Sequence, residues 1–321
     1  MINFLKKHWL FIFLGALATF LVTLWLYGQS LQKLPILPKI TISELEGPAI
    51  SLNTSLSFNI TSPLPTQAVI YTYKNTALTS EQINNIAKIL NFTVSPSMVQ
   101  DSQSTVYYWN DQDKFLSVNI NNGEISFGHY QAPQDNTLPF PTTDEVENLF
   151  NELAKNLGLS SNLEFKVQQT RFLKTNGYNL AETDISRANL LELTATPQIN
   201  NISITTFFGQ PLAIMRISRD KTLYSLKTTI LPNLTAGPSY PLKNIREIQA
   251  MILTEGKIFN SGQSTENDQI TLNSLGITKS KLVYYLSPKN TILSPVFILG
   301  GENNTAQIGI PAISSNYFLL R

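Results

Sequence analysis

Residues 105–130 read TVYYWNDQDKFLSVNINNGEISFGHY. Apolar and aromatic side chains alternate with polar ones in three short segments, which is the period of a strand with one buried face. Asn122-Gly123 is a dipeptide that favours the two-residue turn of a tight hairpin, and the polar residues Asn110–Asp113 supply another turn. The stretch therefore predicts a three-stranded antiparallel meander, with strands at Thr105–Trp109, Phe115–Ile120 and Glu124–Tyr130.

A helix is predicted just before this meander. In LTSEQINNIAKIL (residues 78–90), Thr79 stands three residues before Gln82, which is the spacing of a capping box. Apolar residues then recur at i, i+3, i+4 and i+7, namely Ile83, Ile86, Ala87 and Leu90. A helix with one apolar face has to bury that face, so we expect it to lie on a sheet.

Two further stretches predict helices of the same kind. In FPTTDEVENLFNELAKNLGL (140–159), Thr142 or Thr143 is the N-cap and Gly158 ends the helix. In YPLKNIREIQAMILTEGKIF (240–259), Pro241 fits the first turn and Gly256 stops the helix. Alternating segments between and after these helices predict strands near Glu164–Gln169, Ala188–Thr194, Ile202–Phe207, Leu212–Ile217, Leu223–Ile230, Lys281–Leu286 and Ser294–Leu299.

The chain begins with a long uncharged segment. About 20 apolar residues span a bilayer as a helix, and Trp9–Gly28 provides that length without a small-x-small cleavage site at its end. Lys6 and Lys7 precede the run, so the positive-inside rule places them in the cytoplasm. The run predicts an uncleaved signal anchor, with a single pass through the plasma membrane, a cytoplasmic N-terminus and an extracytoplasmic C-terminus.

Small residues lie close together in the first half of this run. Gly15, Ala18 and Thr19 follow the i, i+3, i+4 spacing that places them on one helix face. Small residues let two helices approach closely in lipid. These three are therefore candidates for a transmembrane interface, although small residues are also common in anchors that only tether.

The predicted fold class is α+β: an N-terminal transmembrane helix, followed by antiparallel sheets that are each covered by helices in helix-plus-meander units. Five prolines restrict the segment between the run and the first unit, which indicates an extended stalk. The predicted domains are a cytoplasmic stub (1–8), the anchor (9–28), the Pro-rich stalk (29–66), a helix-meander module (67–140) and an α+β region (141–321) that divides into 141–238 and 239–321.

Composition excludes several partners and sites. The chain has 23 Lys+Arg and 22 Asp+Glu, so the part that follows Lys6 and Lys7 has 21 basic and 22 acidic residues. Such a balance gives no electrostatic footprint for nucleic acid. The absence of cysteine excludes thiol chemistry and disulfides, and an exported chain without them favours a bacterial cell envelope. Two histidines in the whole chain make a zinc site very unfavourable, and no cofactor motif is present.

Catalytic patterns are equally sparse. His129 is the one histidine in the exported part, and no G-x-S-x-G elbow accompanies it. Ser218 to Lys221 matches S-x-x-K, but it lies between two predicted strands and is interpreted as a turn. Asp111 and Asp113 lack the third ligand and the glycine of a calcium loop. We therefore expect no catalytic, cofactor-binding or metal-binding residues and no enzymatic activity, while a carboxylate-based hydrolase remains an alternative.

The end of the chain carries a family resemblance. In KLVYYLSPKNTILSPVFILGGENNTAQIGIPAIS (281–314), an aromatic strand is followed by a strand that closes at Gly300-Gly301 and by Ile310-Pro311-Ala312. This resembles the end of YycH/YycI ectodomains, and FFGQPLAIMRISRDKTLYSLKTTI (207–230) is similar to their preceding section. The helix at 78–90 with its Gly-Glu-Ile hairpin resembles a PepSY-type module.

The resemblance implies a function. YycH and YycI are membrane-anchored accessory proteins that act on an envelope-sensing histidine kinase. The resemblance to these proteins implies a non-enzymatic regulatory protein that binds a membrane partner, such as that kinase, and that contacts the bilayer through residues 9–28. Two alternatives stay open: a stand-alone cell-envelope module that binds glycan or peptide, and a protease-inhibitory role like that proposed for PepSY modules.

Overall fold

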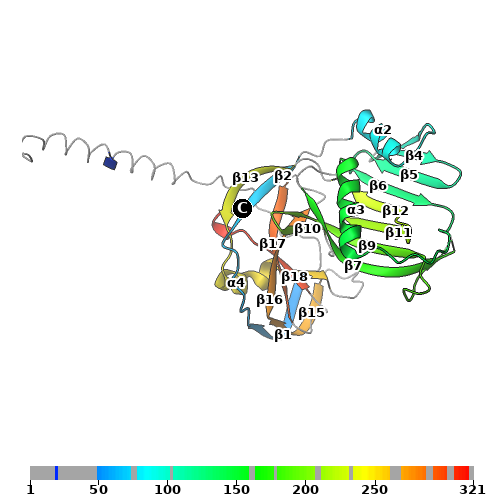
Figure 1. Cartoon of the computed structure of the whole chain (residues 1–321). Helices are drawn as coiled ribbons and strands as arrows, with labels where there is room; N and C mark the ends of the chain where they lie inside the picture. Colours follow the sequence, from blue (N-terminus) through cyan, green and yellow to red (C-terminus); the bar gives the residue numbers. More distant parts are fainter. Residues whose placement is uncertain are drawn as a thin grey trace, which may run out of the picture. The chain divides into compact units, whose positions relative to one another are not determined.

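The computed structural model describes residues 19–20, 49–73, 78–101, 104–158, 163–176, 179–206, 211–230, 234–260, 269–286, 292–301 and 307–317. Ile40–Ser315 form one compact unit, and Met1–Lys39 with Asn316–Arg321 form a second. The larger unit contains two sheets; among the described helices, two lie on one face of the first sheet and one lies on the second (Figure 1). A short 3-10 helix, Ser315–Tyr317, follows the last strand.

The first sheet is antiparallel throughout and contains the predicted meander. The strands Lys114–Asn119 and Glu124–His129 form the predicted hairpin, but the predicted two-residue turn is wrong: four residues, 120–123, connect the strands, and of these only Gly123 has a positive φ, 71°. Neighbours along the sheet are β3 (Ser97–Gln100), β4 (Thr105–Asn110), β5 (Lys114–Asn119), β6 (Glu124–His129), β12 (Leu223–Thr229), β11 (Ala213–Ser218), β9 (Leu190–Ile199), β7 (Glu164–Thr175) and β8 (Leu180–Glu182).

Helices α2 (Ser80–Ile89) and α3 (Thr143–Asn156) both cover one face of this sheet (Figure 1). Each begins with a complete capping box, formed by Thr79 with Gln82 and by Thr142 with Glu145. In each box the threonine side chain accepts from the backbone N–H of the second residue, whose side chain accepts from the threonine N–H. Their apolar stripes form one core with the sheet, including Ile86, Phe150, Leu116, Ile125, Leu193 and Met215.

The second sheet mixes parallel and antiparallel pairs. Its order is β15 (Gln269–Ile277), β1 (Ala49–Phe58), β14 (Lys257–Asn260), β18 (Gln307–Pro311), β17 (Ile292–Gly300) and β16 (Lys279–Leu286). β1 runs parallel to β15 from Ala49↔Gln269 to Phe58↔Ile277, and the other neighbouring pairs in this order are antiparallel. β2 (Gln67–Tyr73) pairs with the start of β17 and with β13 (Leu234–Pro241).

Helix α4 (Ile245–Glu255) packs on the second sheet against β1 and β18. Its N-cap is Asn244, because Pro241 still belongs to β13, so the predicted start at Pro241 is four residues too early. Gly256 ends the helix as predicted. A Cβ atom at Gly256 would lie 3.0 Å from Ile50 and 3.1 Å from Ile308, so the chain passes close to both strands.

One short strand, β10 (Ile202–Thr205), joins the two sheets. Ile202 and Ser203 pair antiparallel with β9, whereas Ile204 and Thr205 pair parallel with Tyr284 and Tyr285 of β16. An apolar cluster surrounds this junction, in which Tyr71 and Tyr284 meet edge to face with ring centroids 5.3 Å apart. The hydrogen-bonded backbone therefore continues from one sheet into the other.

The predicted fold class is wrong in several respects. Strands predominate over helices, and α2 and α3 share one sheet, so the helices do not cover sheets in repeated helix-plus-meander units. Parallel pairs β1–β15 and β10–β16 also occur among the described strands. Local patterns could not show this, because parallel pairing joins segments that lie far apart in the sequence. Residues 49–58 of the predicted stalk belong to the second sheet.

The predicted membrane anchor is not supported. Most of Trp9–Gly28 lies outside the described residues. In the part of the chain that the structure describes, no helix is long and apolar enough to cross a bilayer; the longest described α-helix, α3, has 14 residues, against about 20 for a span. The expected signal anchor, single-pass topology and plasma-membrane location are corrected accordingly.

Candidate functional site

A large cleft lies where the helix-free faces of the two sheets meet. Its volume is about 1130 Å³, just above the range of roughly 300–1,000 Å³ that is usual for ligand sites. Strands β7, β9 and β10 contribute Gln168, Gln169, Arg171, Thr194, Thr196, Ser203 and Thr205. The other lining residues, mainly from the second sheet, are Phe259, Lys279, Ser280, Lys281, Val283, Ile298, Gly300, Gly301 and Gln307, with Ser62 and Pro211.

Strand alternation places the polar side chains of the first sheet in this cleft. Successive side chains of a strand point to opposite faces. On β9, Leu193 and Ala195 belong to the core under the helices, so Thr194 and Thr196 face the other way. Their cross-strand neighbours on β7 are Gln169, opposite Thr194, and Lys166, opposite Thr196. The face without helices thus presents hydroxyl and amide groups.

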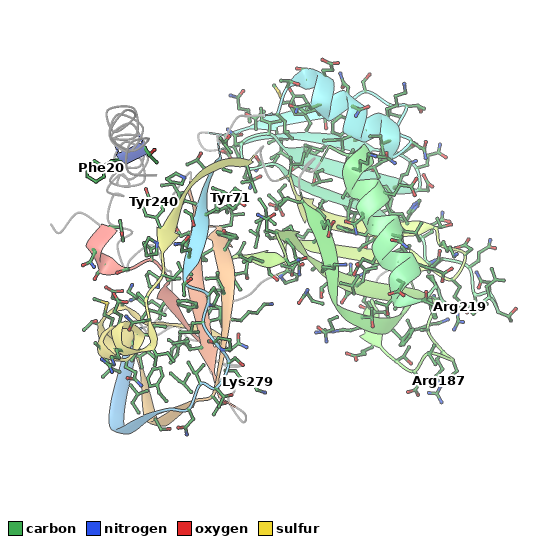
Figure 2. The ribbon with its side chains drawn as sticks, turned by 60° about the vertical axis from the view of Figure 1, so that its left-hand side comes forward. Phe20, Tyr71, Arg187, Arg219, Tyr240 and Lys279 are labelled. Carbon is green, nitrogen blue, oxygen red and sulfur yellow. The ribbon has the colours of Figure 1, made fainter. Side chains whose placement is uncertain are left out.

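The second sheet contributes a face of the same kind. Ile298 pairs with Lys281, and Ile308 on the neighbouring strand lies on the opposite face, next to α4. Lys279, at the start of β16 (Figure 2), and Lys281 are two residues apart and therefore share the face of Ile298. This face of the second sheet also has an apolar part beside the two amines, formed by Phe259, Val283 and Ile298.

The charges in the cleft are all of one sign. Arg171, Lys279 and Lys281 line it, and no aspartate or glutamate does so among the described residues. Glu192 is the cross-strand neighbour of Arg171, but Arg216 holds its carboxylate at 2.7–2.8 Å and Glu192 is 9% exposed. Within the described ranges, Lys279 and Lys281 form no ion pair. The cleft is therefore positively charged.

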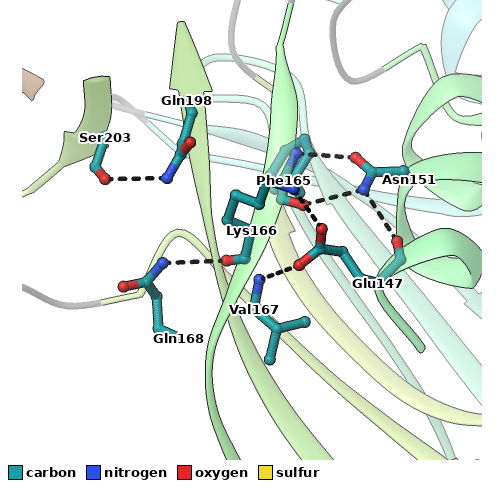
Figure 3. A network of polar contacts seen from close by, with 8 residues as sticks. All are labelled: Glu147, Asn151, Phe165, Lys166, Val167, Gln168, Gln198 and Ser203. Carbon is teal, nitrogen blue, oxygen red and sulfur yellow. Dashed lines mark hydrogen bonds and ion pairs between the residues drawn. The ribbon is translucent and has the colours of Figure 1, made fainter. Parts of the chain in front are cut away.

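Helix α3 fixes the strand that carries Gln168, Gln169 and Arg171 (Figure 3). The Asn151 side chain accepts from the Phe165 N–H at 2.8 Å and donates to the Phe165 carbonyl at 3.0 Å. Glu147 accepts from the Val167 N–H at 3.1 Å and from Lys166 Nζ at 2.7 Å. The hydrogen bond from Lys166 lowers the pKa of Glu147.

A bulge follows directly after these contacts. The register between β7 and β9 shifts between Val167 and Gln169, which makes Gln168 the extra residue. The Gln168 side chain donates to the Lys166 carbonyl at 3.4 Å, and Gln198 donates to the Ser203 hydroxyl at the same distance (Figure 3). The bulge re-aims the polar side chains of β7, and α3 holds it in place.

A second, smaller pocket of about 480 Å³ lies at the start of α4. It is lined by Leu64, Pro65, Thr66 and residues 242–246. Its buried amine is already in use, because Lys243 Nζ lies 2.9 Å from Glu255 and donates to the Pro311 carbonyl at 2.8 Å. This pocket therefore offers less for ligand recognition than the cleft.

The residues considered from the sequence lie elsewhere. His129 is at the end of β6, 3.6 Å from Asp113 and stacked on Tyr224, and burial lowers the pKa of His129. Asp111 lies in the predicted turn, where its N–H donates to the Lys114 carbonyl. The Ser218–Lys221 segment is the turn between β11 and β12, as predicted.

The predicted transmembrane-interface residues add nothing to the site. Gly15 and Ala18 lie outside the described residues, and Thr19 is exposed. Among the residues that the structure describes, no cluster of acidic residues and histidines could hold a metal ion. The sequence analysis did not identify Arg171, Lys279 or Lys281 as site residues. The spacing of Lys279 and Lys281, two residues apart, could have indicated two amines on one face of a strand.

Comparisons with known proteins leave the family open. No family model matches the chain, and no curated protein is significantly similar to it. A crystal structure of an uncharacterized protein from Eubacterium rectale ATCC 33656 is similar at 15% sequence identity, covering 81% of this chain and 86% of that chain, with a TM-score of 0.42. A likeness at that score carries no argument, so the resemblance to YycH/YycI and PepSY proteins stays a prediction.

Proposed function

We propose that this protein is a binding protein whose cleft takes up an anionic, hydroxyl-bearing ligand, such as a stretch of an acidic glycan. The observation that carries the proposal is the set of three cations, Arg171, Lys279 and Lys281, in a cleft without a lining carboxylate among the described residues. Carboxylate groups of a ligand would form charge-assisted hydrogen bonds with these cations, which are stronger than bonds between neutral groups.

The remaining lining suits a polyhydroxylated chain. Thr194, Thr196 and Ser203 provide hydroxyl groups that both donate and accept hydrogen bonds. Phe259 and Val283 provide an apolar surface for the carbon-bound hydrogens of a ligand ring. A free inorganic anion would use only the cations, whereas an acidic glycan would use all three kinds of group.

The test is binding of the full-length chain to oligogalacturonate, a carboxylated glycan, by isothermal titration calorimetry. Lys279→Gln with Lys281→Gln should weaken binding by about tenfold, since exposed charge contacts contribute modestly, and added salt should weaken binding of the unaltered chain. Lys88→Gln with Lys155→Gln is the matched control. It removes the same charge from α2 and α3, on the opposite face of the first sheet, and should leave affinity unchanged.

Two results would contradict the proposal. Equal weakening in the control pair would mean that only net charge matters and that the cleft is not the site. Binding of maltohexaose, a neutral glycan, as tightly as oligogalacturonate would remove the role of the cations. Modulation of a sensor histidine kinase, which the resemblance implies, stays a separate prediction that this experiment does not address.

A further inference from the structure

The free edge of the first sheet is apolar and uncharged. β3 pairs with β4 from Ser97↔Tyr108 to Gln100↔Thr105, and no second strand pairs with β3 in the described part of the chain. All four residues of β3 are exposed, with Met98 at 55% and Val99 at 57%. Exposed apolar side chains therefore flank a row of backbone groups that a further strand can pair with.

Three other strand edges in the described part of the chain are protected. Asn151 and Glu147 of α3 occupy the backbone groups of β7 at Phe165 and Val167. β8 is three residues long and ends in Glu182, and β13 contains two prolines. Natural proteins use such devices to prevent strands from joining at an edge. β3 is also short, with four residues, but it contains no proline and no charged residue.

We infer that β3 pairs antiparallel with β3 of a second copy of this chain, forming a two-fold dimer. A two-fold axis normal to the sheet relates the strands, and it keeps the same face of each copy on the same side. The register must then place either Met98 or Val99 opposite itself. In both registers the centre is apolar, and Asp101 faces Ser95 or Ser97 of the other copy, so no like charges meet.

This self-complementarity favours a second copy over an unrelated peptide. In a two-fold pair, the central residue lies opposite the same residue of the other copy. Two charged residues would repel each other at that position, whereas two copies of Met98 or Val99 bury apolar surface there. A strand of four residues gives a small interface. Interfaces that bury less than about 1,000 Å² are transient, so we expect a weak dimer that forms with rising concentration.

The first experiment is sedimentation equilibrium of the full-length chain over a range of concentrations. The apparent mass should rise toward that of a dimer. Val99→Lys places like charges at the centre of the pair if Val99 is the central residue, and one position from the centre if Met98 is, so it should weaken association by at least about tenfold. Ile185→Lys is the matched control, because Ile185 is equally exposed at 53% but lies in the loop after β8. It should leave association unchanged.

The second experiment locates the contact. The chain has no cysteine, so Val99→Cys and Met98→Cys each introduce one thiol. Opposed residues of antiparallel strands have Cα atoms about 4.5–5.5 Å apart, within disulfide range. One of the two variants should form a disulfide-linked dimer under mild oxidation, well above an Ile185→Cys control. A monomeric mass at every concentration, or cross-linking no greater than the control, would overturn the inference.

Discussion

The ion pair between Lys243 and Glu255 should be asymmetric in its effect on stability. The Lys243 side chain is 1% exposed, and its amine bonds Glu255 at 2.9 Å and the Pro311 carbonyl at 2.8 Å. The Glu255 side chain is 22% exposed. Loss of the carboxylate leaves a buried cation without its counter-charge, whereas loss of the amine leaves a carboxylate that water can reach.

Glu255→Gln is the decisive perturbation. Removing one partner of a buried pair costs about 3–5 kcal/mol, and the partial exposure of Glu255 points to the lower end, about 3 kcal/mol. Lys243→Met keeps most of the volume and mainly leaves the Pro311 carbonyl without a donor, at a cost of about 1 kcal/mol. For an m value near 3 kcal/mol/M, the urea midpoint should fall by about 1 M for Glu255→Gln and about 0.3 M for Lys243→Met.

Urea unfolding followed by circular dichroism measures both midpoints. The control is Glu124→Gln, which removes the acid of an exposed pair with Lys227, whose side chains are 40% and 65% exposed. Such a pair is worth less than about 1 kcal/mol. The reasoning is refuted if Glu255→Gln costs no more than Glu124→Gln, or if Lys243→Met is the more damaging of the two core substitutions.

Two further substitutions test the first sheet. Thr228 is 1% exposed and, among the described residues, its hydroxyl has no hydrogen-bond partner; Thr228→Val should raise stability by about 1 kcal/mol, and a lower melting temperature would show that the hydroxyl is bonded. The pKa of Glu147 lies below its usual 4.5, so its contribution is complete above the unfolded pKa and is lost as pH falls through the lower folded pKa. Stability curves of wild type and Glu147→Gln should therefore converge as pH falls below 4.5, and a constant gap would contradict this.

The sequence by itself determined the local elements. The capping box at Thr79, the N-cap at Thr142 and the hairpin that contains Asn122-Gly123 appear where predicted, although the hairpin loop has four residues and not two. Each depends on interactions among residues within four positions of one another, so the pattern contains all the information needed. The apolar stripe of α2 was predictable for the same reason, because helical spacing alone decides which residues share a face.

Element boundaries were less predictable where two local signals compete. Pro241 fits a helix start, yet it ends β13, and Asn244 caps α4 instead. β13 pairs with β2, which lies more than 160 residues earlier, from Leu234↔Tyr73 to Pro241↔Gln67. The long-range backbone pairing outweighs the local preference of one proline, and no short window of sequence contains it.

Tertiary structure alone decided the arrangement of the sheets and the site. The parallel pairing of β1 with β15 joins residues about 220 positions apart, and β10 connects both sheets through two residues on each side. The cleft brings Arg171 together with Lys279 and Lys281 from the other sheet. Alternation along each strand fixes which side chains share a face, but only the pairing of distant strands brings two such faces together, because that pairing depends on the folding of the whole unit.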